Sequence, residues 1–246
     1  MEAWNLAPDK ARSSDTITTF IIFSEDGMCE PYYFATFQKP GKVKVSVTGD
    51  QKSNFRNYAN TLLSCEEKGL LEKDGQGGYT IKADVTHHIW SVFDRDVDTS
   101  RPEMRALDDL TFTQSIQACQ NVGINVAWSN DAFELWILLH FEDVNPGVEL
   151  SRDQIYVRLT EIFKTLPNQS AEMANETSKD RFNYKLSFKK RNEFNLFVLP
   201  LLESKRVQAE QRAEALANAF PADHLFHNCN PLTKVPLLVA SIRSFH

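Results

Sequence analysis

The sequence predicts an α/β fold in which a parallel sheet carries helices on both faces and a helical lobe follows it. Four short apolar or β-branched segments alternate with helical patterns, the order that builds a parallel sheet through crossover connections. One of these segments, residues 89–93, is apolar except for Ser91 and is followed by Asp94 and Asp96, as expected of a buried strand that ends at a ligand site. With 246 residues, of which 42% are hydrophobic, the chain is long enough to bury a sizeable core.

Two strands are expected before this apolar run. After a polar lead-in to about residue 16, residues 17–23 are rich in β-branched and aromatic side chains and predict a buried strand. The strand ends just before Glu25, and a helix begins near Glu30, because Pro31 is tolerated in a first helical turn. Residues 43–47 alternate as a second strand. A helical pattern then runs from about residue 53 to residue 70, before a glycine-rich loop at 75–78.

The segments after Asp96 complete the expected sheet. Apolar residues between positions 104 and 119 recur at helical spacing, and residues 123–128 form a fourth strand that ends at 129–131. Residues 133–141 are apolar nearly all round, which is typical of a buried helix, although Glu134 lies within it. We therefore expect an α/β core over residues 15–145.

The chain changes character after Pro146, and residues 146–246 predict a helical lobe that packs on the core. Ser151 and Gln154 have the spacing of a capping box, and the helix that they begin continues until Pro167. Residues 203–219 predict an alanine-rich, charged helix. From Val235 onward the chain is apolar enough to return to the core.

Composition excludes several classes of protein. Lys and Arg number 27 against 33 Asp and Glu, so the net charge is −6 and any contact with nucleic acid must come from a local patch. The four cysteines show no C-x-x-C pairing, which indicates reduced core thiols rather than a disulfide framework or a zinc cluster. No apolar run approaches the roughly 18 residues of a transmembrane helix, and the amino terminus has no signal region. We expect a cytoplasmic protein without membrane contact.

Three carboxylates predict a metal site at the edge of the sheet. Glu25 follows the first strand, and Asp94 and Asp96 follow the third, where the carboxyl ends of parallel strands border the ligand crevice. Two residues apart on an extended backbone, the aspartates face the same side. Oxygen ligands suit Mg²⁺ or Mn²⁺, and two such ions would favour in-line attack on a phosphodiester. The alternative is a pair of acidic loop ends without a ligand, because aspartate is also common in turns.

A basic stretch between residues 179 and 191 is the candidate contact for nucleic acid. Phe182, Tyr184 and Phe188 lie between its cations, and such aromatic side chains can stack on bases while the cations neutralise phosphates. The alternative is a solvated, charged face. The basic residues are Lys179, Arg181, Lys185, Lys189, Lys190 and Arg191.

Three segments resemble the successive motifs of RloB-like proteins: SEDGMCEPYYF at 24–34, VFDRD at 92–96 and GINVAWSNDAFELWILLHF at 123–141. Weaker signals at 184–185 and 230–235 fit the same family, so the resemblance covers most of the chain. It implies a TOPRIM-like domain, in which the glutamate after the first strand and the Asp-x-Asp after the third hold Mg²⁺. It also implies association with restriction loci and abortive phage resistance, often beside an ATPase.

Two positions depart from the family's pattern. Asp26 stands directly after Glu25, where the family usually has glycine, so either the turn is rebuilt or Asp26 adds a ligand. Asp131 follows Asn130 where the family usually has proline. Resemblance to related TOPRIM nucleases makes Glu134 a further candidate metal ligand. The alternatives for Glu134 are a buried ion pair with an arginine or a cap at the helix start.

Two other residues near these motifs have competing interpretations. His140 follows the apolar run and is more typical of a packed core histidine than of a ligand. Arg95 lies between the two aspartates, where it can contact phosphate or pair with its neighbours.

Together these observations predict a Mg²⁺- or Mn²⁺-dependent nuclease effector in anti-phage defence. Glu25, Asp94 and Asp96 would bind metal, and Glu25 could also position water or act as a base. The expected partners are a DNA or RNA substrate, an AAA- or ABC-type ATPase and a second copy of the chain. The alternative is a non-catalytic sensor or regulatory subunit that binds an ATPase or a phage factor.

Overall fold

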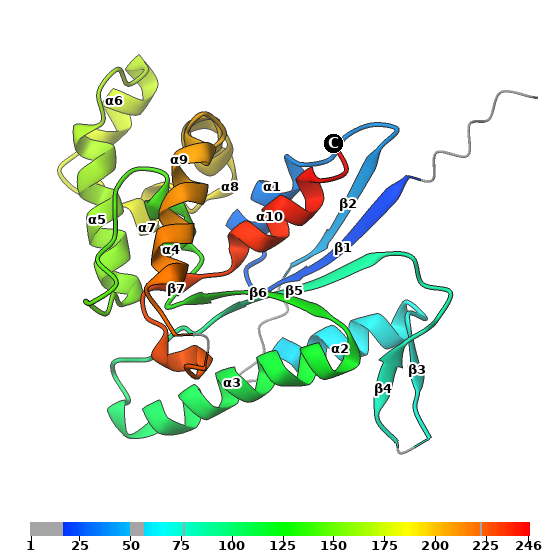
Figure 1. Cartoon of the computed structure of the whole chain (residues 1–246). Coiled ribbons are helices and arrows are strands. Elements are labelled where there is room, and N and C mark those ends of the chain that lie inside the picture. Colours follow the sequence, from blue (N-terminus) through cyan, green and yellow to red (C-terminus); the bar gives the residue numbers. More distant parts are fainter. Residues whose placement is uncertain (1–16, 50–56, 76, 222) are drawn as a thin grey trace, which may run out of the picture.

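The computed structural model describes residues 17–49, 57–75, 77–221 and 223–246. The polar lead-in before residue 17, the predicted helix start near residue 53 and Gln76 of the glycine-rich loop lie outside the described residues. Elsewhere, the predicted strands and helices follow one another in the predicted order as far as residue 130, with a short hairpin inserted at residues 71–81 (Figure 1).

The central sheet has five strands in the order β2-β1-β5-β6-β7. Four of them run parallel, as predicted: β1 (Thr18–Ser24), β2 (Val43–Thr48), β5 (His88–Asp94) and β6 (Asn125–Asn130). β1 and β5 are buried along most of their length, because layers of helices cover both faces of the sheet. Their carboxyl ends meet side by side, with Ser24 opposite Val92, and this is the edge at which a ligand crevice is expected.

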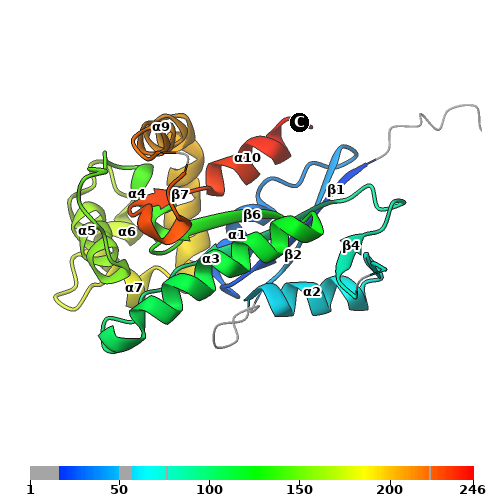
Figure 2. The ribbon, with the colours of Figure 1, turned by 60° about the horizontal axis from the view of Figure 1, so that its bottom comes forward.

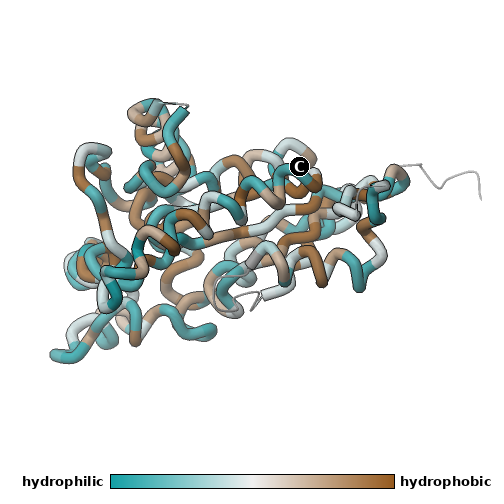
Figure 3. Tube along the Cα trace, turned by 90° about the horizontal axis from the view of Figure 1, so that it is seen from below, coloured by the Kyte–Doolittle hydropathy of each residue, from teal (hydrophilic) through white to brown (hydrophobic). Residues whose placement is uncertain are grey.

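Helices cover both faces of the sheet, which confirms the predicted layers. Figures 1 and 2 both show α2 (Asn57–Glu67) and α3 (Arg105–Val122) side by side on one face. The other face carries α1 (Cys29–Ala35) and α10 (Val235–Arg243). Hydrophobic stretches, drawn in brown, recur along the strands and helices in Figure 3, and their buried side chains form one core cluster. All four cysteines are free and buried, as predicted.

Three strands were not predicted from the sequence. β3 (Leu71–Lys73) and β4 (Tyr79–Ile81) form an antiparallel hairpin around the expected loop. Its strands have three residues each and few buried side chains, so they leave no apolar alternation to detect. β7 (Leu232–Thr233) adds an antiparallel strand beside β6, and two residues are too few for any periodic pattern.

Most of the remaining helices gather at one side of the sheet (Figure 1). α4 (Glu134–Leu139) is fully buried, as its apolar sequence predicts, and packs against α5 (Arg152–Thr165) and α9 (Leu199–Asn218). α5 begins with the predicted capping box, in which both hydrogen bonds are present. α9 begins before the predicted residue 203, because its first turn accommodates Pro200.

Short helices connect these longer elements. They are η1 (Pro102–Met104), α6 (Ala171–Thr177), α7 (Tyr184–Ser187), α8 (Arg191–Glu193), the π-helical segment η2 (Phe194–Val198) and η3 (Phe226–Asn228). After them α10 packs against β6, so the predicted return of the chain from Val235 to the core is confirmed. The division between core and lobe at residue 145 stays a prediction. Among the described helices, none is long and apolar enough to cross a membrane.

Candidate functional site

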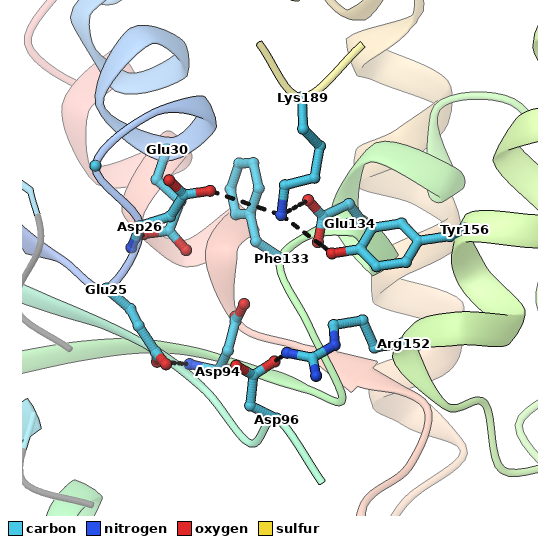
Figure 4. A pocket seen from close by; sticks show the side chains of 11 residues that line it. Glu25, Asp26, Glu30, Asp94, Asp96, Phe133, Glu134, Arg152, Tyr156 and Lys189 are labelled. Carbon is cyan, nitrogen blue, oxygen red and sulfur yellow. Dashed lines mark hydrogen bonds and ion pairs between the residues drawn. The ribbon is translucent and has the colours of Figure 1, made fainter. Parts of the chain in front are cut away.

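A pocket of about 300 Å³ lies where β1 and β5 end and α4 begins (Figure 4). All four carboxylates that were predicted as metal ligands line it, together with two acidic and two basic side chains. The acidic residues are Glu25, Asp26, Glu30, Asp94, Asp96 and Glu134, and the basic residues are Arg152 and Lys189. Phe133 and Tyr156 add aromatic rings to the lining.

Glu25 is fixed beside Asp94 by the neighbouring strands. Because β1 pairs with β5, Glu25 reaches the end of β5, where its Oε2 accepts a hydrogen bond from the backbone N–H of Asp94 at 2.8 Å. The Oδ1 atom of Asp94 is enclosed and has no hydrogen-bond partner in the described part of the chain. Burial, with added repulsion from Glu30 and Glu25, raises the pKa of the Asp94 carboxyl well above its ordinary value. Asp94 therefore holds a buried oxygen to which a cation could bind.

The turn after β1 is organised by Asp26. Its Oδ1 accepts a hydrogen bond from the N–H of Met28 at 2.6 Å, and its own N–H donates to Glu30 Oε2 at 3.1 Å. Glu30 is fully buried, and its Oε1 has no hydrogen-bond partner among the residues that the structure describes. Burial, with added repulsion from Asp26 and Glu25, raises the pKa of the Glu30 carboxyl well above its ordinary value. Asp26 thus both shapes the turn and lines the pocket.

Asp96 faces the pocket from a loop that Asp131 holds in place. The N–H of Asp96 donates to the carbonyl of Asp131 at 3.0 Å. The Asp131 side chain accepts hydrogen bonds from the backbone N–H groups of Val97 at 2.8 Å and Arg152 at 2.9 Å. Asp131 thereby joins the Asp96 loop to the start of α5, and the guanidinium of Arg152 pairs with the Asp96 carboxylate. A cation from the carboxyl-terminal helices therefore compensates one predicted metal ligand.

Lys189 compensates the charge of a second predicted metal ligand, Glu134. Its Nζ lies 2.6 Å from Glu134 Oε1, 3.1 Å from the Tyr156 hydroxyl and 3.6 Å from Asp26 Oδ2 (Figure 4). Burial alone would lower the pKa of the ammonium, but the neighbouring groups, Glu134 above all, outweigh burial and raise the pKa, so Lys189 stays charged. Glu134 is therefore in a buried ion pair, as one interpretation of the sequence held, with a lysine in place of the expected arginine.

The aromatic residues of the basic stretch belong to the core. Phe182, Tyr184 and Phe188 are buried, so they present no face on which bases could stack. The expectation of stacking at these positions was wrong, because these rings cluster together with Phe163. The buried aromatic residues therefore anchor this stretch to the core, and only Tyr184–Ser187 and the terminal Arg191 are helical within it.

The cations of this stretch do not act as one set. Lys189 turns into the pocket, whereas Lys179 pairs with Glu176 and Lys185 lies 3.9 Å from Asp153. The other three, Arg181, Lys190 and Arg191, are exposed, and Arg191 lies over the ring of Tyr32. Contact of the exposed cations with nucleic acid stays a prediction.

Arg95 and His140 both point away from the pocket chemistry. Arg95 donates from Nε to Asp109 at 2.9 Å and from Nη1 to Asn130 at 3.1 Å. It is buried in these contacts, so the structure corrects both expectations, a phosphate contact and pairing with the flanking aspartates. His140 is a packed core histidine, whose Nδ1–H donates to the carbonyl of Trp136 at 2.8 Å. Burial lowers the pKa of His140 to about 4.

Sequence reasoning missed three polar side chains of the pocket lining: Glu30, Arg152 and Tyr156. Glu30 lies before Pro31, where the sequence signalled only a helix start. Arg152 and Tyr156 belong to a helix whose pattern signalled only a cap and an apolar stripe. Lys189 was identified as basic, but its direction depends on how the following helices pack.

The donor set of the pocket suits a hard divalent cation. Its acidic side chains offer oxygen atoms, which Mg²⁺ and Mn²⁺ prefer. Within the described residues, no three His, Cys, Asp or Glu side chains are grouped as a metal cage. Mg²⁺ is often bound by only one or two carboxylates, with water and substrate oxygens completing its shell. The enclosed oxygens of Asp94 and Glu30 fit this partial mode of binding.

Comparison with known proteins supports the resemblance in the motifs. The family model of the RloB-like proteins matches residues 20–242, which include all the residues of the pocket. No curated protein and no solved structure gives a significant match. Because the match covers most of the sequence, the chain belongs to the RloB-like protein family.

Proposed function

We propose that this chain is a Mg²⁺- or Mn²⁺-dependent, TOPRIM-like nuclease that acts as an effector in anti-phage defence. One observation carries the proposal: Asp94 and Glu30 each keep a buried oxygen without a hydrogen-bond partner among the described residues, in a pocket rich in carboxylates. Buried, uncompensated carboxylates are costly, and neighbouring ones repel. A divalent cation removes both costs, so the pocket is better explained by a cation site than by structural packing.

In this proposal the residues of the pocket have different roles. Asp94 and Asp96 would hold the ion, together with Glu25. The ion would supply Lewis-acid stabilisation of a phosphoryl oxygen and lower the pKa of a water. Glu25, held by the Asp94 N–H, is suited to position that water or to accept its proton. Arg152 is suited to attract a phosphate.

The substrate class that follows from this chemistry is nucleic acid, either DNA or RNA, because both offer a phosphodiester. The net charge of −6 gives the chain little general affinity for nucleic acid. We therefore infer that activity depends on a partner, and the family resemblance suggests an AAA- or ABC-type ATPase. Such dependence would protect the host until infection.

A non-catalytic sensor or regulatory subunit is the second candidate function. Asp96 and Glu134 are already paired with Arg152 and Lys189, and this observation favours it. In that function the pocket would be an internal ion-pair network, and binding to an ATPase or a phage factor would need no metal.

Phage challenge of cells that carry the chain with its flanking genes distinguishes the two functions. Asp94→Asn removes a proposed metal ligand, while Asp143→Asn makes the same chemical change at a side chain that is 90% exposed and outside the pocket. We expect protection to be lost in Asp94→Asn and kept in Asp143→Asn. Equal protection by both variants would reject catalysis at this pocket and favour the sensor function.

A further inference from the structure

The pocket has two sides that differ in what neutralises their carboxylates. On one side Asp94 has an enclosed oxygen without a hydrogen-bond partner in the described chain, and Glu25 lies beside it. On the other side Glu134 and Asp26 both face the Nζ of Lys189, at 2.6 Å and 3.6 Å. The first side can accept a cation, whereas the second already contains one.

The side chain of Lys189 is held in the pocket by specific contacts with Tyr156 and Glu134. The Tyr156 hydroxyl lies 3.1 Å from Lys189 Nζ and 3.5 Å from Glu134 Oε2, so it contacts both members of the ion pair. The Glu134 side chain is only 2% exposed, and at that burial a salt bridge is screened little by solvent. A divalent ion could reach Glu134 only by displacing the ammonium or by lying against it with the same sign of charge.

We infer that the pocket holds a single divalent cation, at Asp94, and that the ammonium of Lys189 takes the place of a second one. The inference rests on the proposed function and replaces two expectations, a pair of metal ions and Glu134 as a metal ligand. A phosphate bound between the ion and Lys189 would meet positive charge on both sides. Lys189 would supply positive charge to the phosphate at any metal concentration, because its ammonium is part of the protein.

Counting bound ions tests this inference without measuring activity. Equilibrium dialysis of the full chain against Mn²⁺, with the bound ion measured by electron paramagnetic resonance, should give one ion per chain at saturation. Two ions per chain would overturn the inference and leave the proposed function standing. No bound ion would reject the metal-dependent function itself, and the inference would fall with it.

A paired substitution tests whether Glu134 binds metal. The double variant Glu134→Gln with Lys189→Met removes the ion pair without leaving a buried charge. We expect one Mn²⁺ per chain, with a dissociation constant within about threefold of the wild type. A loss of more than tenfold in affinity would identify Glu134 as a ligand and overturn the inference.

A matched control uses an ion pair outside the pocket. Glu149→Gln with Arg105→Met makes the same chemical change where the atoms lie 3.2 Å apart and both side chains are largely exposed. We expect this variant to bind Mn²⁺ as the wild type does. An equal loss of affinity in both double variants would show a general effect of pair removal, and the assignment of Lys189 would lose this support.

Discussion

The two walls of the pocket come from different parts of the chain and are held in place by different means. The acidic wall, Glu25, Asp94 and Asp96, follows the strands of the sheet, and a backbone N–H fixes Glu25. The basic wall, Arg152 and Lys189, comes from the helical region after residue 146 and meets the acidic side chains through ion pairs. The strands of the sheet therefore place the carboxylates. The helices supply the cations that neutralise some of these carboxylates and leave the others to bind a metal ion.

This difference makes the pocket a joint product of the two regions. The acidic wall alone would concentrate charges of one sign beneath a covering of helices, which is unfavourable without a counterion. The basic wall compensates Asp96 and Glu134 but leaves an oxygen of Asp94 without a hydrogen-bond partner in the described structure. In the part of the chain that the structure describes, the carboxylate of the acidic wall that still lacks a counterion is therefore Asp94, at the end of β5.

The largest expected effect comes from breaking the basic wall at Lys189. Lys189→Met leaves the Glu134 carboxylate buried without its cation, which should lower the free energy of unfolding by about 3–5 kcal/mol. Adding Glu134→Gln should restore most of this loss, since no charge then remains to be compensated. Urea denaturation of the wild type, the single variant and the double variant measures both steps. If the single variant were as stable as the double, the Glu134 carboxylate would cost nothing without its cation, and the expectation for Lys189→Met would be wrong.

The next effect tests the acidic wall. Mg²⁺ at about one hundred times its dissociation constant should stabilise the chain by about 2.7 kcal/mol, because it binds the folded state only. Asp94→Asn with Asp96→Asn should abolish this stabilisation, and Asp143→Asn should keep it. Thermal unfolding with Mg²⁺ and with a chelator provides the measurement. A wild-type melting temperature that is the same with Mg²⁺ and with a chelator would favour the sensor function.

The acidic wall could be predicted because its signals are local. A largely apolar run identifies β5 as a strand covered on both faces, and the aspartates after it must lie at the carboxyl edge of the sheet. Glu25 follows β1 in the same way and so lies at the same edge, although the pairing of β1 with β5 is known only from the structure. Strand, edge and carboxylates therefore follow from short stretches of sequence.

The basic wall could not be predicted, because its side chains are aimed by distant packing. Lys189 lies among other cations, and only the burial of Tyr184 and Phe188 beside it turns its side chain inward. Arg152 faces Asp96 because Asp131, far away in the sequence, accepts a hydrogen bond from its N–H. Such contacts leave no periodic pattern along the chain.

A smaller effect, on the dependence of stability on pH, separates the pocket from the core behind it. His140 is buried and neutral, with a pKa lowered to about 4, whereas in the unfolded chain its pKa is about 6.5. The unfolded state therefore binds more protons between these values, so stability falls as the pH drops through this range. The raised pKa values of Glu30 and Asp94 act with the opposite sign, because there the folded state binds the extra protons.

His140→Gln isolates this contribution. From pH 7 to pH 5 the wild type should lose about 2 kcal/mol that the variant keeps, given the two pKa values of His140. Denaturant unfolding at each pH measures the difference in slope. Parallel curves for the two proteins would mean that the pKa of His140 is not lowered in the folded state and that His140 does not contribute to the loss of stability in acid.

The smallest effect on stability, and a distinct effect on binding, is expected from the exposed cations of residues 179–191. Replacing Lys179, Arg181, Lys185, Lys190 and Arg191 with glutamine changes only exposed residues, so each substitution should alter stability by less than about 0.5 kcal/mol. Because the aromatic residues between them are buried, these cations could neutralise phosphates but would have no rings beside them to stack on bases. Binding to nucleic acid should therefore weaken evenly across sequences. The slope of log affinity against log salt should fall by about 0.9 for each lost contact with duplex DNA. Titration of labelled duplexes at several salt concentrations measures this slope, and an unchanged slope would assign the stretch to a solvated face, leaving Arg152 and Lys189 in the pocket as the phosphate-binding cations.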